Sequence, residues 1–265
     1  MADGVIERPP YRSKFVLAYF ILAAIVGVAV AAFIVFAASS STNTPGAAGG
    51  NGARPAAWNG FRPKGFVADQ VNLIALHVSS TYHLPNGKQL VAVKASIPPS
   101  FQNSLIITDY AVSYSSRGQT GYQVIPAADS VTYELCGLGA DCAIASGKPS
   151  LARSLLLRRE ALELALYTFH FEPSIQTVVT YMPPAAGQKA SFVYLFLRNQ
   201  PAISDALARP ISATLPGAKP PLASQISPSE ATTVDELTAP DLYRFSFTRG
   251  QDGGVWLVFN PSGIS

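Results

Sequence analysis

Residues 15–38 read FVLAYFILAAIVGVAVAAFIVFAA, and this stretch decides how the chain is organised. Every residue in it is apolar except Gly27, and no Asp, Glu, Lys or Arg occurs between Lys14 and Arg54. Because a helix rises about 1.5 Å per residue, the stretch is long enough to cross a hydrocarbon core of about 30 Å. The sequence therefore predicts a membrane-spanning helix over residues 15–38, in direct contact with membrane lipid.

The charges that flank this stretch predict its orientation. Arg8, Arg12 and Lys14 precede it, whereas the flank that follows is uncharged for many residues. Positively charged residues stay preferentially on the cytoplasmic side of a membrane. We therefore expect a single-pass protein of the cell membrane, with residues 1–14 in the cytoplasm and the C-terminal part outside it. A cleaved signal peptide is the alternative, because residues 37–39 are small, but its apolar region normally covers only about 7–15 residues.

The composition after the membrane stretch changes twice. Residues 39–60 are rich in Ser, Thr, Gly, Ala and Pro, which is typical of a flexible linker. Aromatic residues return near Phe61, and residues 61–265 are enough for one domain with a core. The net charge of +3 is scattered along the chain, so it gives no basic patch of the kind that nucleic-acid binding needs.

The pattern of apolar residues predicts an α+β domain with an antiparallel or mixed sheet packed against two amphipathic helices. The two helices are expected to begin near Phe66 and at about Ser150, and the second, which ends near Phe171, is expected to be the centre of the domain. A short helix is expected over Ile203–Arg209, and exposed loops near 117–121 and over 210–231. The expected strands cover 89–97, 105–114, 130–135, 176–182, 191–198, 242–249 and 255–259.

The chain has two cysteines, Cys136 and Cys142, separated by a short Gly-rich run. An even number of cysteines outside the cytoplasm favours a disulfide, which stabilises by about 2 kcal/mol in the chain-entropy model for so small a loop. A reduced buried pair and a redox-active pair are the alternatives, although the spacing is not Cys-x-x-Cys.

Four residues of the second helix are candidate binding residues: Arg158, Glu160, Glu163 and His170. On a helical wheel Arg158 falls within the main apolar strip, so it needs either a structural ion pair or an anionic ligand. Glu160 and Glu163 are three positions apart on the predicted polar side, a spacing that general acid and base chemistry would allow. Arg159, also on that side, is expected to form a surface ion pair with Glu163 worth a few tenths of a kcal/mol.

The sequence carries none of the catalytic motifs that we tested. It has no Gly-x-Ser-x-Gly, no Ser-x-x-Lys and no His-Glu-x-x-His, and Ser146–Pro149 departs from a phosphate-binding loop. The three histidines are not at metal-ligand spacing from one another, so we expect no metal site and no cofactor.

These observations favour a membrane-anchored extracytoplasmic module that acts by contact with a protein or an envelope component and is not catalytic. An enzyme of unrecognised type would instead bring Arg158, Glu160, Glu163 or His170 together in a deep pocket. A small-ligand sensor would show a large apolar cavity beside the face of Phe192 and Tyr194. A homodimer through the membrane helix is a further expected contact, since Gly27 and Ala31 would let two helices approach closely.

Overall fold

The computed structural model describes residues 60–102, 105–116, 119–145, 150–216, 222, 226–251 and 253–262. Residues 1–59 lie outside these ranges, so the expected cytoplasmic tail, membrane helix and nearly all of the linker are not described. Within the described ranges no helix is both long enough and apolar enough to span a bilayer.

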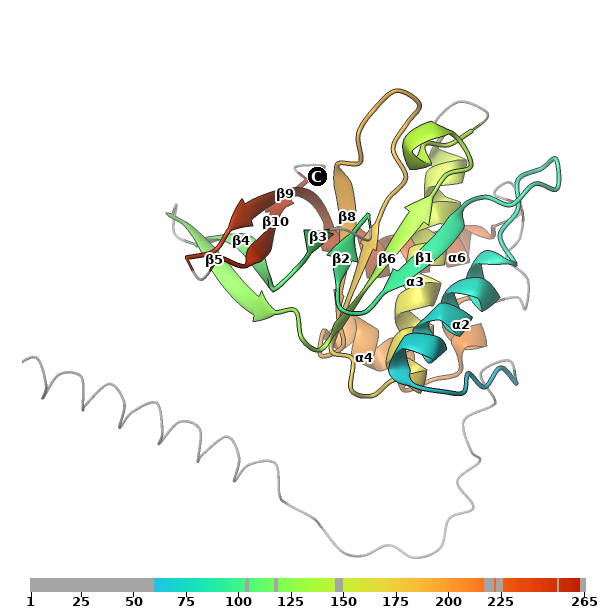
Figure 1. Cartoon of the computed structure of the whole chain (residues 1–265). Coiled ribbons are helices and arrows are strands. Elements are labelled where there is room, and N and C mark those ends of the chain that lie inside the picture. Colours follow the sequence, from blue (N-terminus) through green and yellow to red (C-terminus); the bar gives the residue numbers. More distant parts are fainter. Residues whose placement is uncertain are drawn as a thin grey trace, which may run out of the picture. The chain divides into compact units, whose positions relative to one another are not determined.

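The centre of the described part is a mixed sheet of eight strands in the order β1-β6-β7-β8-β9-β10-β4-β5 (Figure 1). The neighbouring pairs β6/β7 and β10/β4 are parallel, and the other neighbours are antiparallel. A separate two-stranded sheet pairs β2 with β3. The strands are β1 Ala92–Ser96, β2 Ser100–Phe101, β3 Leu105–Ile106, β4 Asp109–Ser116, β5 Gln119–Pro126, β6 Ser130–Cys136, β7 Thr177–Tyr181, β8 Phe192–Leu197, β9 Leu242–Arg249 and β10 Val255–Pro261.

The helices gather on the half of the sheet that contains β1, β6, β7 and β8 (Figure 1). The described α-helices are α2 Val67–Ser79, α3 Leu151–Phe171, α4 Pro201–Leu207, α5 Ile211–Thr214 and α6 Pro228–Thr238. The predicted α+β class with a mixed sheet is confirmed. The two expected amphipathic helices are α2 and α3, and α3 packs against α2, α4, α6 and β7.

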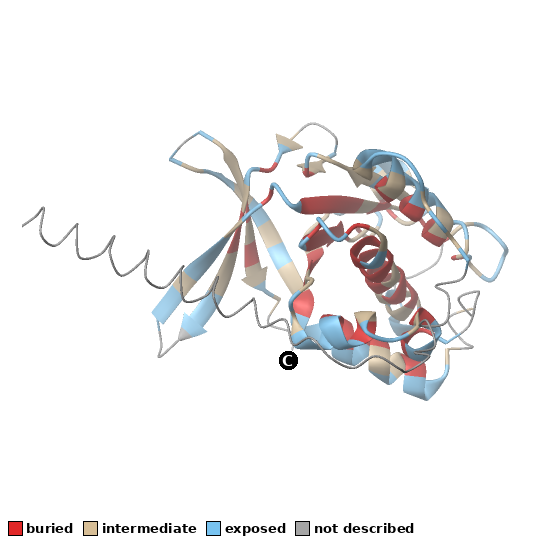
Figure 2. Cartoon of the chain, turned by 90° about the horizontal axis from the view of Figure 1, so that it is seen from below, coloured by how far each residue is buried: buried red, intermediate tan, exposed pale blue. Residues whose placement is uncertain are grey.

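Helix α3 is the core helix because buried residues surround it on several sides (Figure 2). Strand β7 separates two apolar clusters: Val178 belongs to the cluster on the helix side, and Val179 belongs to the cluster on the opposite face. Strand β8 lies between β7 and β9, as predicted from the apolar residues on both of its faces. A strand that is buried on both faces carries consecutive apolar residues, so its sequence does not alternate between apolar and polar residues.

Two sequence predictions of loops are wrong. The loop expected at 117–121 overlaps β5, an edge strand that is mostly exposed and therefore lacks the apolar alternation of a half-buried strand. The loop expected over 210–231 contains α5 and the first turn of α6. Helix α6 begins where the Ser227 hydroxyl accepts a hydrogen bond from the backbone N–H of Glu230, at 3.2 Å.

Candidate functional site

The carboxyl ends of β6 and β7 lie at the same end of the sheet, because the two strands are parallel and α3 connects them. The same connection places the amino-terminal end of α3 at that end of the sheet. Ligands bind preferentially in crevices at the carboxyl ends of parallel strands. This end of the sheet is therefore the favoured position for a binding site.

A disulfide fixes the chain where β6 ends. Cys136 and Cys142 are bonded to each other, so the predicted disulfide is confirmed. Gly137 donates a backbone hydrogen bond to the carbonyl of Cys142 at 2.8 Å. A side chain at Gly137 would collide with the backbone of Ala143, because a Cβ atom there would lie 2.2 Å from its carbonyl oxygen. The loop is thus a compact unit that has no space for a larger residue at this position.

The disulfide loop meets the loop that connects β7 to β8. The backbone N–H of Ile144 donates to the carbonyl of Pro184 at 3.3 Å. Figure 1 shows both loops extending beyond the sheet at the same end of the molecule. Together they form the walls of two openings.

The first opening, which we call the apolar cleft, has a volume of about 510 Å³. Ligand sites typically have volumes of about 300–1,000 Å³ and mostly apolar walls. Apart from Arg153, Ser150 and Ser154, the described side chains on its walls are apolar. The residues that line it are Ile144, Ser150, Arg153, Ser154, Leu157, Met182, Pro183, Ala185, Ala186, Phe192 and Leu242.

The second opening, the aromatic groove, is also lined by residues of the β7–β8 loop and measures about 830 Å³. Its aromatic side chains are largely occupied with one another: the Phe101 ring centroid lies 4.8 Å from that of Tyr181 and 5.5 Å from that of Phe245. Glu134, Lys189 and Asp141 add charges of both signs to its walls. The walls of the apolar cleft are the more apolar of the two, with Arg153 as the one charged side chain among the described residues that line it.

A cavity beside Phe192 and Tyr194 was the expected mark of a small-ligand site. Phe192 lines the apolar cleft, whereas Tyr194 is buried in the core with 2% of its surface exposed. The remaining walls come from segments that are far apart in the sequence, which is why no local pattern pointed to them. The Pro-Pro-Ala-Ala-Gly run at 183–187 was the one local signal of an unusual loop.

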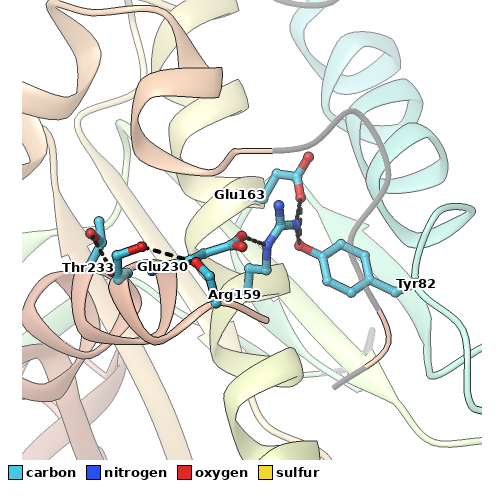
Figure 3. A network of polar contacts seen from close by, with 7 residues as sticks. Tyr82, Arg159, Glu163, Glu230 and Thr233 are labelled. Carbon is cyan, nitrogen blue, oxygen red and sulfur yellow. Dashed lines mark hydrogen bonds and ion pairs between the residues drawn. The ribbon is translucent and has the colours of Figure 1, made fainter. Parts of the chain in front are cut away.

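One of the four candidate residues of α3, Glu163, belongs to a different place, a buried polar network centred on Arg159 (Figure 3). The Arg159 guanidinium donates to Glu230 at 2.7 Å, to Glu163 at 3.0 Å and to the Tyr82 hydroxyl at 2.6 Å. The Tyr82 hydroxyl in turn donates to Glu163 at 2.6 Å. Only 1% of the Arg159 side chain is exposed. This network joins α3, α6 and the segment that follows α2 from inside the domain.

The two adjacent arginines are placed the opposite way round from the prediction. Arg159, expected on the surface with Glu163, is buried, and the side chain of its partner Glu163 is only 12% exposed. Arg158, expected within the apolar strip, is half-buried: it pairs with the exposed Asp235 and donates to the Thr238 hydroxyl at 2.8 Å. The reason is α6, which packs along this side of α3 and supplies the partners of both arginines.

Glu160, expected on a solvated face, is completely buried. Neither oxygen of its carboxyl group has a hydrogen-bond partner among the described residues. Burial, and then the nearby charge of Glu163, raise the pKa of Glu160 well above its ordinary value. Burial also raises the pKa of Glu163, although Arg159 opposes that shift. Burial without a hydrogen-bond partner in the described part of the chain thus disfavours the charged form of the Glu160 carboxyl group.

His170 lies in the last turn of α3, seven residues beyond Glu163, or about 10 Å along the helix axis. Its ring packs edge to face on Phe171 with 4.7 Å between centroids. Burial, followed by the charges of Arg62 and Arg198, lowers its pKa. The structure therefore brings Glu163 together with Arg159, with Glu160 near Glu163, whereas Arg158 pairs with Asp235 of α6 and His170 lies apart. None of the four candidates lines the apolar cleft or the aromatic groove.

Among the described residues, no group of three or more His, Cys, Asp or Glu side chains is arranged to hold a metal ion. Comparisons with protein-family models, with curated proteins and with solved structures found no significant match to this chain.

Proposed function

We propose that this chain is a single-pass membrane protein with a cytoplasmic amino terminus, and that its domain outside the cytoplasm is a binding module. The module holds an envelope component in the apolar cleft and catalyses no reaction on it. The membrane part of this proposal rests on residues 15–38 and on Arg8, Arg12 and Lys14 in front of them. The disulfide agrees with a location outside the cytoplasm.

The observation that carries the proposal is the contrast between the apolar cleft and the buried network. The cleft is open, has mostly apolar walls and lies at the carboxyl ends of β6 and β7. The buried network and the carboxyl group of Glu160 beside it are closed to solvent, since Glu160 is 0% exposed and Glu230 is 4% exposed. A substrate has no path to such groups, so they support the fold. The cleft offers a ligand surface that is apolar and accessible.

The proposal is tested in intact cells with a photoreactive amino acid placed at Phe192, in the cleft, or at Leu76, an exposed position on α2. Position 192 should form a covalent adduct with a discrete envelope component that position 76 does not capture. Adding Ala185→Trp, which places a large side chain in the cleft, should abolish that adduct. Identical adducts at both positions, or an adduct at position 192 that survives the filled cleft, would refute the proposal.

Topology is tested separately with a single cysteine introduced at Leu76 in the chain that keeps its disulfide. A membrane-impermeant maleimide should label this cysteine in intact cells. Labelling only after the cells are broken would place the domain in the cytoplasm and contradict the assignment.

A further inference from the structure

The charge around the apolar cleft is positive. Arg153 is the one charged side chain among the described residues that line it. A second guanidinium, that of Arg244, stacks over Phe192 on the cleft wall, 4.9 Å from the ring centroid. Asp241 directly precedes the lining residue Leu242, but it is 6% exposed and accepts a hydrogen bond from Gln200 at 2.7 Å.

Arg153 differs from the other arginines near it on α3. Arg158 and Arg159 form ion pairs with acidic residues, whereas Arg153 forms none with any described residue. Its backbone N–H donates to the Ser150 hydroxyl at 3.2 Å, which caps α3 and fixes the backbone at this edge of the cleft. The guanidinium is thus a cation beside an apolar surface with no acidic partner in the described part of the chain.

We infer that the cleft binds a single apolar chain that ends in an anionic head, as in a fatty acid, with the head next to Arg153. This inference rests on the proposed function and specifies its ligand. The chain would occupy the surface formed by Leu157, Met182 and Phe192, since an apolar ligand gains most from burying methylene groups there. The carboxylate would pair with a guanidinium, which is the cation best suited to that planar group.

The inference makes two quantitative statements about affinity. Each methylene group added to the chain, from octanoate to dodecanoate, should strengthen binding about fourfold while the cleft has room. Replacing the carboxylate by a hydroxyl, in dodecanol, should weaken binding about tenfold, which is the low end for a charged hydrogen bond because Arg153 is only half-buried.

The test uses the full-length chain in nanodiscs of phosphatidylcholine and a twelve-carbon carboxylate that bears a diazirine near its methyl end. After irradiation, mass spectrometry of proteolytic peptides shows which residues carry the label. This readout separates the cleft from the membrane helix, where an amphiphile would also insert. Label on the peptides that contain Leu157 or Phe192 should be displaced by dodecanoate, and about tenfold less effectively by dodecanol.

Three variants make the test specific. Ala185→Trp and, independently, Ala186→Trp should remove the label from the cleft peptides, provided that the variant keeps the wild-type unfolding midpoint. Arg153→Gln should reduce competition by dodecanoate to the level of dodecanol. The matched control Arg249→Gln removes the same charge from an exposed position of β9 and should leave competition unchanged.

Label confined to residues 15–38, equal competition by dodecanol and dodecanoate, or equal effects of Arg153→Gln and Arg249→Gln would each overturn the inference. Binding to vesicles that contain phosphatidylglycerol, without displacement by dodecanoate, would also overturn it in favour of a two-chain lipid. The proposed function would still stand after any of these outcomes if position 192 captured an envelope component in cells. If neither the fatty-acid label in the cleft nor the adduct at position 192 were found, the proposed function would be refuted as well.

Discussion

Replacing Arg159 by Met should destabilise the domain far more than replacing its neighbour Arg158 by Met. Arg159 is 1% exposed, and its guanidinium is shared by Glu230, Glu163 and Tyr82. Without it, the Glu230 side chain, which is 4% exposed, loses its ion pair inside the protein. Removing one partner of a buried ion pair costs about 3–5 kcal/mol, because the other charge stays buried and uncompensated.

The Arg158→Met variant is the matched control, since it removes the same group one position earlier on the same helix. The side chains of Arg158 and its partner Asp235 are 19% and 62% exposed. An ion pair this open to solvent is worth about 0–1 kcal/mol. The difference between the two variants should therefore be at least about 2 kcal/mol, which is a large part of the total stability of an ordinary domain.

The measurement is equilibrium unfolding of the full-length chain in urea at neutral pH, with the disulfide intact, followed by circular dichroism. The double variant Arg159→Met with Glu230→Met provides a second check, because it removes both charges of the shorter of the two ion pairs that Arg159 forms. It should recover part of the stability that Arg159→Met alone loses. Equal destabilisation by Arg159→Met and Arg158→Met would show that the buried network does not hold α6 to α3 as described here.

Three further results are expected. Burial raises the pKa of Glu160 above its unfolded value, so the native state binds this proton more tightly, and the stabilisation that the bound proton gives is full below the unfolded pKa and lost as the pH rises through the native pKa. Glu160→Gln should therefore flatten the decline in unfolding free energy measured between pH 4 and pH 9. An unchanged slope would contradict the raised pKa of Glu160. Replacing both Cys136 and Cys142 by Ser should lower the unfolding free energy by about 2 kcal/mol, and reduction of the wild type should reproduce that loss in urea titrations unless the bond contributes nothing. Deleting residues 15–38 should release the chain from membranes in alkaline carbonate extracts, and a deleted chain that stays with the pellet would argue against the anchor.

The parts of the fold that the sequence predicted are those in which a local pattern dominates. Strand β8 is apolar on both faces, and the β9–β10 hairpin is marked by the Gly-rich run at 250–254. Strand β5 and helix α6 were missed because their sequences are polar and one face of each is exposed. Helix α6 did carry a signal, Ser227 three positions before Glu230, which is the spacing of a capping box.

The candidate site was harder to predict, for two physical reasons. A helical wheel places Arg158 and Arg159 about 100° apart, but it does not say which neighbour covers which side, and here α6 reverses the expected order. The walls of the apolar cleft come from Ile144, Leu157 and Leu242, which only the fold brings together. Phe192 was the one wall residue that sequence reasoning placed beside a cavity.

The most direct test of the binding module is native mass spectrometry of the full-length chain. The chain is extracted from its own membranes in a mild detergent and is freed from the detergent in the gas phase. The wild type should retain one small anionic amphiphile per chain, and Ala185→Trp, purified in the same way, should arrive without it. A wild type that carries nothing, or a filled-cleft variant that carries the same molecule in the same amount, would contradict the assignment of the cleft as the binding site.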